Sequence, residues 1–202
     1  MTDTPAADLA AAGRELHALG LSPGTSGNLS VRWDDGLLVT PTGAGLGGLT
    51  AATISRLDAD GRLLNGPPPT KEVPLHLALY RRLPAARAVV HLHSTHAVAV
   101  SCCEPHPPRS ADDVLPALTP YFRMRVGTVP LCPYGPPGTD ALAASVAGVP
   151  ASARAVLLAN HGPAATGGSL DEAVAAAIEV EEAAKLHLLL DGRPVRLLPA
   201  DA

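Results

Sequence analysis

The sequence predicts a single α/β domain in which helices pack closely on a sheet. Hydrophobic residues make up 47% of the 202 positions but only five side chains are aromatic, so the core must consist of small aliphatic groups. Apolar residues recur at helical spacing near both ends of the chain, while short alternating segments between turn residues predict antiparallel strands. No segment resembles a long linker, so residues 1–202 are expected to form one domain.

Turn and cap residues predict where these elements begin and end. Pro5 and Gly20 suit the start and the end of an opening helix, and Asp34-Asp35-Gly36 is a hairpin signal. Ser169 and Glu172 form a capping box that opens a long C-terminal helix. The elements expected in chain order are a helix at 5–19, strands at 29–33, 37–40, 54–57 and 62–64, a helix at 73–83, a strand from 88 that carries His91 and His93, a proline-rich loop at 104–120, strand pieces at 121–126 and 129–132, a helix at 139–146, a strand at 155–160 and a helix from 170 to about 190.

Charge and composition favour a small-molecule role. The net charge is -4 and neither sign forms a long block, so the chain has no electrostatic footprint for nucleic acid or for an anionic membrane. The first residues lack the pattern of a signal peptide, and no apolar run reaches the roughly 18 to 20 residues that span a bilayer. We therefore expect a cytoplasmic protein with neither a nucleic-acid nor a membrane partner.

The three cysteines are expected to be reduced. Cys102, Cys103 and Cys132 are an odd number without metal-type spacing, and two adjacent cysteines are poor candidates for a structural disulfide. We interpret them as mostly buried small hydrophobic residues.

The segment 88–96, Ala-Val-Val-His-Leu-His-Ser-Thr-His, is the first candidate for a functional site. Side chains alternate along a strand, so His91 and His93 share one face. Val90 and Leu92 then point into the opposite, apolar layer. This is a spacing at which a backbone presents two imidazoles to one metal ion.

A third histidine follows a second buried strand. His161 comes directly after the apolar run at 155–160, so two strands end on histidine and we expect their ends to meet. Three imidazoles are a common ligand set for catalytic zinc, with one position open for water or substrate. The same nitrogens also admit iron, cobalt, nickel or manganese. A lone buried histidine is more often a hydrogen-bonded core residue, but three at strand ends favour the metal site.

Of the remaining histidines, the role of His96 stays open and the other four are left out of the predicted site. His96 is equally compatible with a partner of the metal ligands and with a plain polar residue. His17, His76 and His187 lie on predicted helices without partners at useful spacing, and His106 lies in the proline-rich loop.

Three polar segments are candidate anion sites. Residues 22–28 and 40–43 are glycine-containing loops with hydroxyl side chains, and residues 70–72 precede a helix. The exposed amides at a helix N-terminus suit a phosphate or carboxylate. From spacing alone, Glu72 is better explained as a solvated carboxylate at a helix start, Lys71 as a surface charge, and both loops as turns.

Together these pieces resemble the class II aldolase/adducin family over nearly the whole chain, with five motifs in the family's order. They are Ser26-Gly27-Asn28-Leu29-Ser30, Thr40-Pro41-Thr42-Gly43, Thr70-Lys71-Glu72, His91-Leu92-His93-Ser94 and Asn160-His161-Gly162. The resemblance implies a three-layer α/β/α domain with a central, mainly antiparallel sheet. It also implies a homotetramer with fourfold symmetry and sites between subunits.

The resemblance also implies roles for individual residues. Zn²⁺, or another divalent ion such as Mn²⁺, Co²⁺ or Fe²⁺, would bind His91, His93 and His161. Glu72 resembles the family's acid/base residue, which can also ligate the metal when substrate is absent. The substrate phosphate would be held by Gly27, Asn28, Thr42, Gly43, Thr70 and Lys71.

Lys71 departs from the family pattern, and Tyr121 lies outside the five motifs. Family aldolases often carry two small hydroxyl residues before the glutamate, whereas this chain has Thr70-Lys71, which adds a positive charge. Tyr121 is a candidate hydrogen-bond donor to the leaving group, although packing of a strand tyrosine at a subunit contact is the favoured explanation.

Within the family, segments 70–72, 91–96 and 118–122 most resemble the 3-oxo-tetronate 4-phosphate decarboxylases. The predicted function is a metal-dependent carbon-carbon lyase that forms dihydroxyacetone phosphate from that substrate through a metal-stabilised enediolate. The alternatives are a retro-aldolase of the fuculose-phosphate type and a sugar-phosphate dehydratase or epimerase. A non-catalytic, adducin-like binding module is an alternative of a different class.

Overall fold

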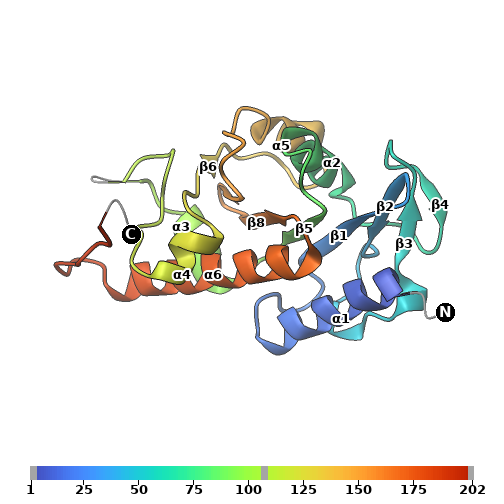
Figure 1. Cartoon of the computed structure of the whole chain (residues 1–202), viewed down its shortest axis with the longest axis horizontal. Helices are drawn as coiled ribbons and strands as arrows, with labels where there is room; N and C mark the ends of the chain where they lie inside the picture. The colour runs from blue at the N-terminus through green and yellow to red at the C-terminus, as the bar shows by residue number, and fades with distance from the viewer. Residues whose placement is uncertain (1–3, 106–108, 200–202) are drawn as a thin grey trace.

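An eight-stranded sheet runs through the middle of the protein in the order β4-β3-β2-β1-β5-β8-β7-β6 (Figure 1). The computed structural model describes residues 4–105 and 109–199. Neighbouring strands are antiparallel except for β6 and β7, which are parallel. The strands are β1 (Asn28–Trp33), β2 (Gly36–Val39), β3 (Ser55–Leu57), β4 (Leu63–Asn65), β5 (Ala88–His91), β6 (Leu131–Cys132), β7 (Ala155–Leu158) and β8 (Gly162–Gly167).

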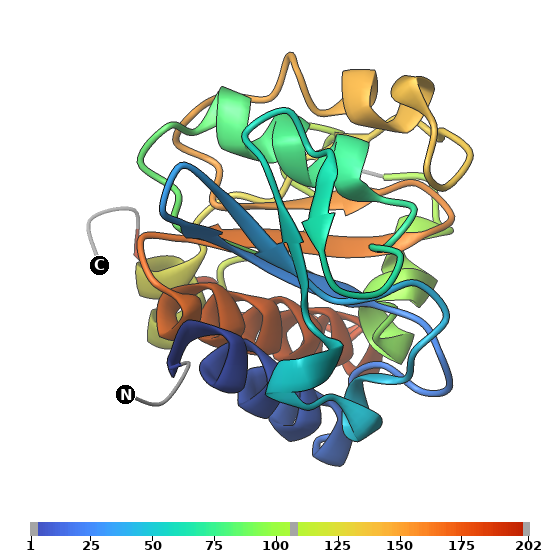
Figure 2. The same cartoon turned by 90° about the vertical axis from the view of Figure 1, so that its right-hand side faces the viewer.

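Helices cover both faces of this sheet, which confirms the predicted three-layer α/β/α fold (Figure 2). One face carries α2 and α5, and the other carries α1 and α6, with α3 and α4 packed against α6. The helices are α1 (Thr4–Ala18), α2 (Val73–Arg82), α3 (Thr95–Ser101), α4 (Pro120–Arg125), α5 (Asp140–Ser145) and α6 (Leu170–Leu189), and the 3-10 turns are η1 (Leu46–Gly48) and η2 (Ala51–Thr53).

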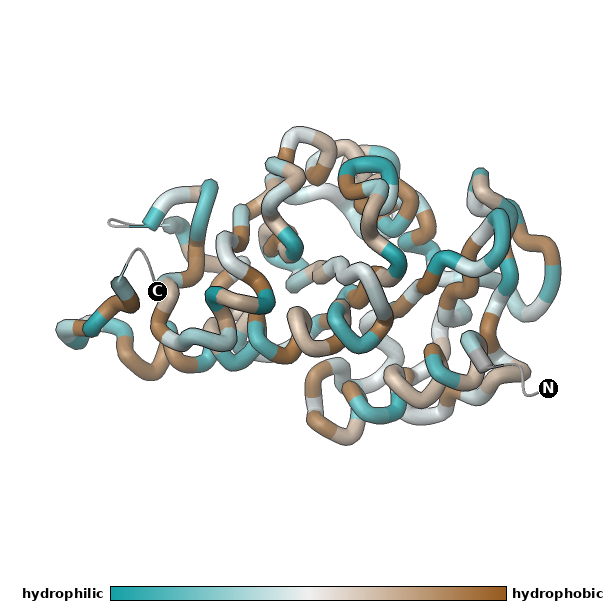
Figure 3. The backbone as a smooth tube through the Cα atoms, in the orientation of Figure 1, coloured by the Kyte–Doolittle hydropathy of each residue, from teal (hydrophilic) through white to brown (hydrophobic). Residues whose placement is uncertain are grey.

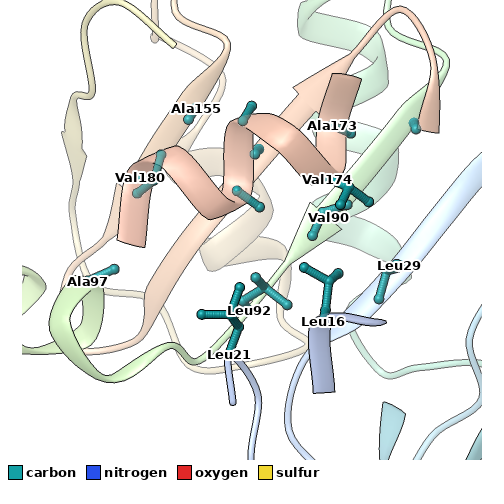
Figure 4. Packing of buried hydrophobic residues seen from close by; sticks show 14 of the residues in the cluster. Leu16, Leu21, Leu29, Val90, Leu92, Ala97, Ala155, Ala173, Val174 and Val180 are labelled. Carbon is teal, nitrogen blue, oxygen red and sulfur yellow. The ribbon is translucent and has the colours of Figure 1, made fainter. Parts of the chain in front are cut away.

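Strand alternation divides the buried side chains between two cores. Val90 and Leu92 enter the larger core with α1 and α6, where Figure 4 shows them near Leu16 of α1. Val89, one residue earlier on the same strand, enters the smaller core with α2 and α5. The predicted apolar layer on one side of the histidine strand is thus confirmed, and the other side holds both the smaller apolar core and His91.

Several predicted boundaries are confirmed by local chemistry. The hairpin between β1 and β2 turns at Asp34 and Asp35, with Asp34 at a φ of 48°. Ser169 caps α6 by accepting a hydrogen bond from the Glu172 amide, while the Glu172 carboxylate accepts from the amide of Gly168. The Ser169 hydroxyl satisfies an amide that the first helical turn leaves unpaired, and the Glu172 carboxylate satisfies the amide just before the cap.

The prediction of a strand at 121–126 is wrong, because this segment forms α4. Pro120 lies in the first turn, where its missing amide hydrogen costs nothing. The Thr119 hydroxyl caps the helix by accepting from the Phe122 amide at 3.3 Å. Phe122 is buried in the core beneath α6, so cap and packing outweigh the strand preference of the aromatic residues.

Strand β8 and helix α3 are elements that the sequence did not predict. The residues of β8, Gly-Pro-Ala-Ala-Thr-Gly, are poor strand formers apart from Thr166, and all six are buried between β5 and β7. Small side chains are what this position needs, because α6 packs closely over the strand. The pairing partners and the helix therefore decide the conformation.

The cysteine prediction is half right. Cys102, Cys103 and Cys132 are all free thiols, as expected, but Cys102 and Cys103 are exposed and only Cys132 is buried. The adjacent pair lies just after the end of α3, where the chain turns away from the core.

Some expectations concern residues outside the described ranges. These are the absence of a signal pattern at residues 1–3 and the loop position of His106.

Hydrophobic and hydrophilic residues are interspersed along the tube in Figure 3. Within residues 4–105 and 109–199, no helix has the length and apolar character needed to cross a membrane.

Candidate active site

The candidate site lies where β5 ends, beside the first residue of β1 and the turn between β7 and β8. Antiparallel register places His91 opposite Asn28 on one side and opposite Ala164 on the other. His161 sits in the turn that precedes β8. The expectation that two strand ends bring these histidines together is consistent with this geometry.

The turn that carries His161 depends on two unusual backbone conformations. Asn160 has a φ of 55° and Gly162 a φ of 147°. A Cβ at Gly162 would lie 2.5 Å from the carbonyl oxygen of Leu92 and 3.5 Å from the Cα of His93. The missing side chain therefore lets the turn pack directly against the backbone that carries His93.

The three imidazoles converge on one point. The Nε2 atom of His91 lies 3.1 Å from that of His93 and 3.3 Å from that of His161. The His91 Nδ1 atom lies 2.9 Å from the Pro163 carbonyl oxygen, which can only accept a hydrogen bond, so Nδ1 carries the proton. The Nε2 lone pair of His91 then faces the other two rings, as it does in metal-binding histidines.

Glu72 completes the cluster from the N-cap position of α2. Its Oε2 atom lies 3.2 Å from Nε2 of His91, and its Oε1 atom lies 3.4 Å from Nε2 of His161. One ligand atom from each of the four residues lies within 4.8 Å of the others. Glu72 is only 6% exposed, so the simple interpretation as a solvated helix-start carboxylate does not apply.

Electrostatics keep the cluster in the protonation states that bind metal. Burial, together with the closeness of His91, lowers the pKa values of His93 and His161 to about 4, so both rings are neutral near pH 7. Burial alone would raise the pKa of Glu72, but its interactions with His91, Asn28 and His161 outweigh burial and lower that pKa. Glu72 is therefore a carboxylate.

The donor set fits a divalent transition-metal ion. Three imidazole nitrogens and one carboxylate match the ligands that zinc takes in catalytic sites, and manganese, iron and cobalt accept the same set. Glu72 Oε1 is buried and has no hydrogen-bond donor. A cation among the four residues would satisfy this oxygen, which otherwise costs desolvation free energy.

An open pocket of about 520 Å³ lies in front of the cluster. His93 and His161 form part of its wall, so a ligand there would reach the converging nitrogens. Tyr134, which is 61% exposed, also lines it and was not predicted from the sequence. The other lining residues are Thr95, Val98, Pro137 and Asn160. Tyr134 lies in a proline- and glycine-rich loop with no periodic pattern, so only the folded chain brings it to the site.

The predicted phosphate segments come together around the N-terminus of α2. The Thr70 amide donates to the Thr40 carbonyl oxygen at 3.0 Å, and the Thr42 amide donates to that of Pro68. This joins the loop that contains Thr42 and Gly43 to the one that contains Thr70 and Lys71. Thr42, Gly43 and Lys71 are exposed, whereas Thr70 is buried.

Gly27 and Asn28 hold their segment against the histidines. Gly27 has a φ of 77°, and a Cβ there would meet the Ser22 hydroxyl. That hydroxyl accepts from the His93 amide at 3.3 Å. The Asn28 side chain is buried and its amide donates to Glu72 Oε2 at 2.8 Å, so it is engaged with the cluster as well as being a predicted phosphate residue.

Tyr121, a predicted site residue, and His96, whose role the sequence left open, do not line the pocket. Tyr121 is 61% exposed in the first turn of α4, its ring is 5.2 Å from the Arg125 guanidinium, and it is not among the pocket residues of this chain. His96 instead binds Glu181, whose carboxylate accepts from its ring and from the amides of His96 and Ala97. Glu181 thus joins the start of α3 to α6.

Sequence reasoning missed one buried group beside the site. His76 is fully buried on α2, where it contacts Asn28 and Ser30. Its helical spacing from Glu72, four residues earlier, places both on one face of α2, and this spacing was the available signal.

Comparison with known proteins decides the family. The model described as Class II Aldolase and Adducin N-terminal domain matches residues 7–188. The chain belongs to the class II aldolase/adducin family. Its relatives named below are a decarboxylase and an aldolase, and this chain is an enzyme of the same family.

Individual family members are similar over most of their length. The chain is 48% identical over 182 residues to the 3-oxo-tetronate 4-phosphate decarboxylase of Escherichia coli K12, covering 90% of this chain and 84% of that protein. It is 39% identical over 175 residues to the L-fuculose phosphate aldolase of the same strain, covering 86% and 78%. The crystal structure of YgbL from Escherichia coli superposes with a TM-score of 0.91 at 42% identity, covering 98% of this chain and 95% of that one.

Proposed function

We propose that this protein is a metal-dependent carbon-carbon lyase that decarboxylates 3-oxo-tetronate 4-phosphate to dihydroxyacetone phosphate. The observation that carries the proposal is the Glu72 carboxylate held against three converging imidazole nitrogens. The 48% identity to a protein named for this reaction supports the choice of substrate.

His91, His93 and His161 would hold the ion, and zinc is the first candidate because their nitrogens match its preferred ligands. A bound divalent cation would stabilise the negative charge that develops on the substrate oxygens when the bond to the carboxylate breaks. Neutral imidazoles are needed for this, and the lowered pKa values of His93 and His161 supply them near pH 7.

Glu72 would carry the proton. As a carboxylate it accepts the proton of the substrate's 2-hydroxyl group. The bond between C1 and C2 then breaks, carbon dioxide leaves, and the bonding electrons pass through C2 to the oxygen on C3. Glu72 returns its proton to C2, and water supplies the proton that restores the hydroxyl group, so one proton is consumed overall.

The substrate phosphate would bind at the joined loops beside α2. Exposed Thr42, Gly43 and Lys71 offer a hydroxyl, a backbone amide and a positive charge there, and Gly27 and Thr70 lie in the adjoining segments. Asn28 retains a second amide hydrogen that can serve the same ligand. The Lys71 charge favours a phosphorylated acid over a neutral sugar.

We further propose that the protein works as a cytoplasmic homotetramer with sites between subunits. Tyr121 and Met124 are both largely exposed on α4, which is what a subunit contact would cover. Tyr121 would then reach a neighbouring subunit's pocket.

Retro-aldol cleavage is the second candidate, because the chain is 39% identical to an L-fuculose phosphate aldolase. The metal-loaded protein should be given 3-oxo-tetronate 4-phosphate and L-fuculose 1-phosphate separately, with dihydroxyacetone phosphate and carbon dioxide measured. We expect both products from the first substrate. Dihydroxyacetone phosphate from the second substrate alone would replace the decarboxylase with the aldolase, and a dehydrated or epimerised product would replace both.

A further inference from the structure

A line of buried polar groups runs from the interior of the smaller core to Glu72. The Tyr80 hydroxyl lies 2.9 Å from the Ser30 hydroxyl, which lies 2.6 Å from Nδ1 of His76. Nε2 of His76 lies 2.5 Å from Oδ1 of Asn28, and the Asn28 amide donates to Glu72 Oε2 at 2.8 Å. Figure 1 shows how α2, which carries His76 and Tyr80, lies over β1 and β5.

The chemistry of these groups gives every hydrogen bond one direction. The Asn28 carbonyl oxygen can only accept, so His76 must carry its proton on Nε2. Burial lowers the pKa of His76 to about 3, so the ring is neutral and its Nδ1 accepts from the Ser30 hydroxyl. Ser30 has then used its hydrogen, and Tyr80 donates to it. Burial raises the pKa of Tyr80, which keeps it a donor.

This line of hydrogen bonds ends at the Glu72 carboxylate, the group that carries the proton in the proposed function. Because all four donors point the same way, the final Asn28 hydrogen is fixed on Oε2 of Glu72, and the buried Oε1, beside His161, is left without a donor. A fully buried imidazole loses its hydration, and its two hydrogen bonds offset this loss. A leucine would fill the same space without that requirement.

We propose that His76 is a positioning residue for Glu72, acting through Asn28, with Ser30 and Tyr80 holding its ring in one orientation. The proposal rests on the role of Glu72 in the proposed function. In this arrangement, one Asn28 amide hydrogen binds the Glu72 carboxylate, and the other is available to the substrate.

The first test separates positioning from stability. We expect His76→Leu in the zinc-loaded protein to lower kcat roughly 10- to 100-fold, the range for a misplaced catalytic group, while KM and zinc content change less than twofold. His76→Gln keeps a donor near the Nε2 position and should recover most of kcat. Leu79→Ala, in the same helix and fully buried outside the line, is the control that loses stability but keeps kcat.

The second test asks whether the effect passes through Asn28. Residues that act in one line give non-additive effects, so adding His76→Leu to Asn28→Ala should lower kcat less than twofold further. The proposal would be overturned if the decrease in kcat of the double variant equalled the product of the decreases in the two single variants. A normal kcat in His76→Leu would also overturn it.

The third test needs no substrate, so its outcome does not depend on the proposed reaction. In the Co²⁺-substituted protein, the visible spectrum reports the ligands around the ion. We expect His76→Leu to shift the spectrum toward that of Glu72→Gln, with His76→Gln and Leu79→Ala matching the unsubstituted protein. An unshifted His76→Leu spectrum would overturn the positioning role. Absence of decarboxylation together with the expected shifts would overturn the proposed reaction alone.

Discussion

The two faces of the central sheet use the same strands for different purposes. On β1 and β5, Leu29 and Val90 face the core with α1 and α6, which is almost wholly apolar. Ser30 and His91, one residue away on each strand, face α2 and belong to a buried polar group that reaches Glu72. One face provides most of the apolar packing, and the other places the chemistry.

A buried carboxylate on the apolar side, that of Glu181, shows how the two faces differ. Glu181 is 5% exposed on α6, and its carboxylate accepts from two amides at the start of α3 and from the His96 ring. Burial would raise its pKa, but these hydrogen bonds outweigh burial and lower it. Glu181 is thus fully partnered, whereas Glu72 keeps one oxygen without a donor. The unsatisfied group marks the face that works on a ligand.

The largest expected effect is the removal of a metal ligand. His161→Ala should lose stoichiometric metal and all measurable turnover, because two imidazoles and a carboxylate bind a divalent ion more weakly than the full set. Metal analysis of the purified variant and an activity assay check this. A variant that keeps one ion per chain and normal turnover would remove His161 from the site.

The next effect separates the proton carrier from the ligands. Glu72→Gln should lower turnover by about 100-fold or more, the usual scale of acid/base catalysis, with the metal and the fold largely retained. Turnover with saturating substrate, metal content and circular dichroism measure the three quantities. Undiminished turnover would show that another group carries the proton.

A change on the apolar face should have the opposite outcome. Leu16 is fully buried on α1, and Leu16→Ala should lower the free energy of unfolding by about 2 to 5 kcal/mol. Its kcat should stay within about twofold of the unsubstituted value, since the cavity lies in the core across the sheet from α2. Urea unfolding and steady-state kinetics measure the two. A large fall in kcat in fully folded Leu16→Ala would contradict the functional separation of the two faces.

The smallest effect is a pH dependence of stability that belongs to the polar face. His76 stays neutral when folded because its pKa is lowered to about 3, but it takes up a proton in the unfolded chain below about pH 6.5. Its contribution is therefore present above pH 6.5 and lost as the pH falls, by up to about 1.4 kcal/mol per pH unit. Urea unfolding of chelator-treated protein at pH 7 and pH 5 should show a shallower loss in His76→Leu than in the unsubstituted protein. Equal slopes would contradict the burial of a neutral His76.

Local chemistry in the sequence predicted most of the fold and the centre of the site. Alternation along a strand is a property of the backbone, so the shared face of His91 and His93 follows from their spacing. The hairpin at Asp34 and the cap at Ser169 depend on neighbouring residues alone. The motif pattern added Glu72, which spacing alone left as a surface carboxylate.

The remaining features depend on partners distant in the chain. Strand β8 has poor strand formers and exists because β5, β7 and α6 enclose it. Tyr121 starts a helix because Thr119 and Pro120 set its first turn and the core takes up Phe122. The packing of α2 on β1 also determines the role of His76. Its two hydrogen bonds join it to Ser30 and Asn28, which are 46 and 48 positions away in the chain. Burial removes water as an alternative partner, so only the assembled tertiary structure makes this histidine part of the site.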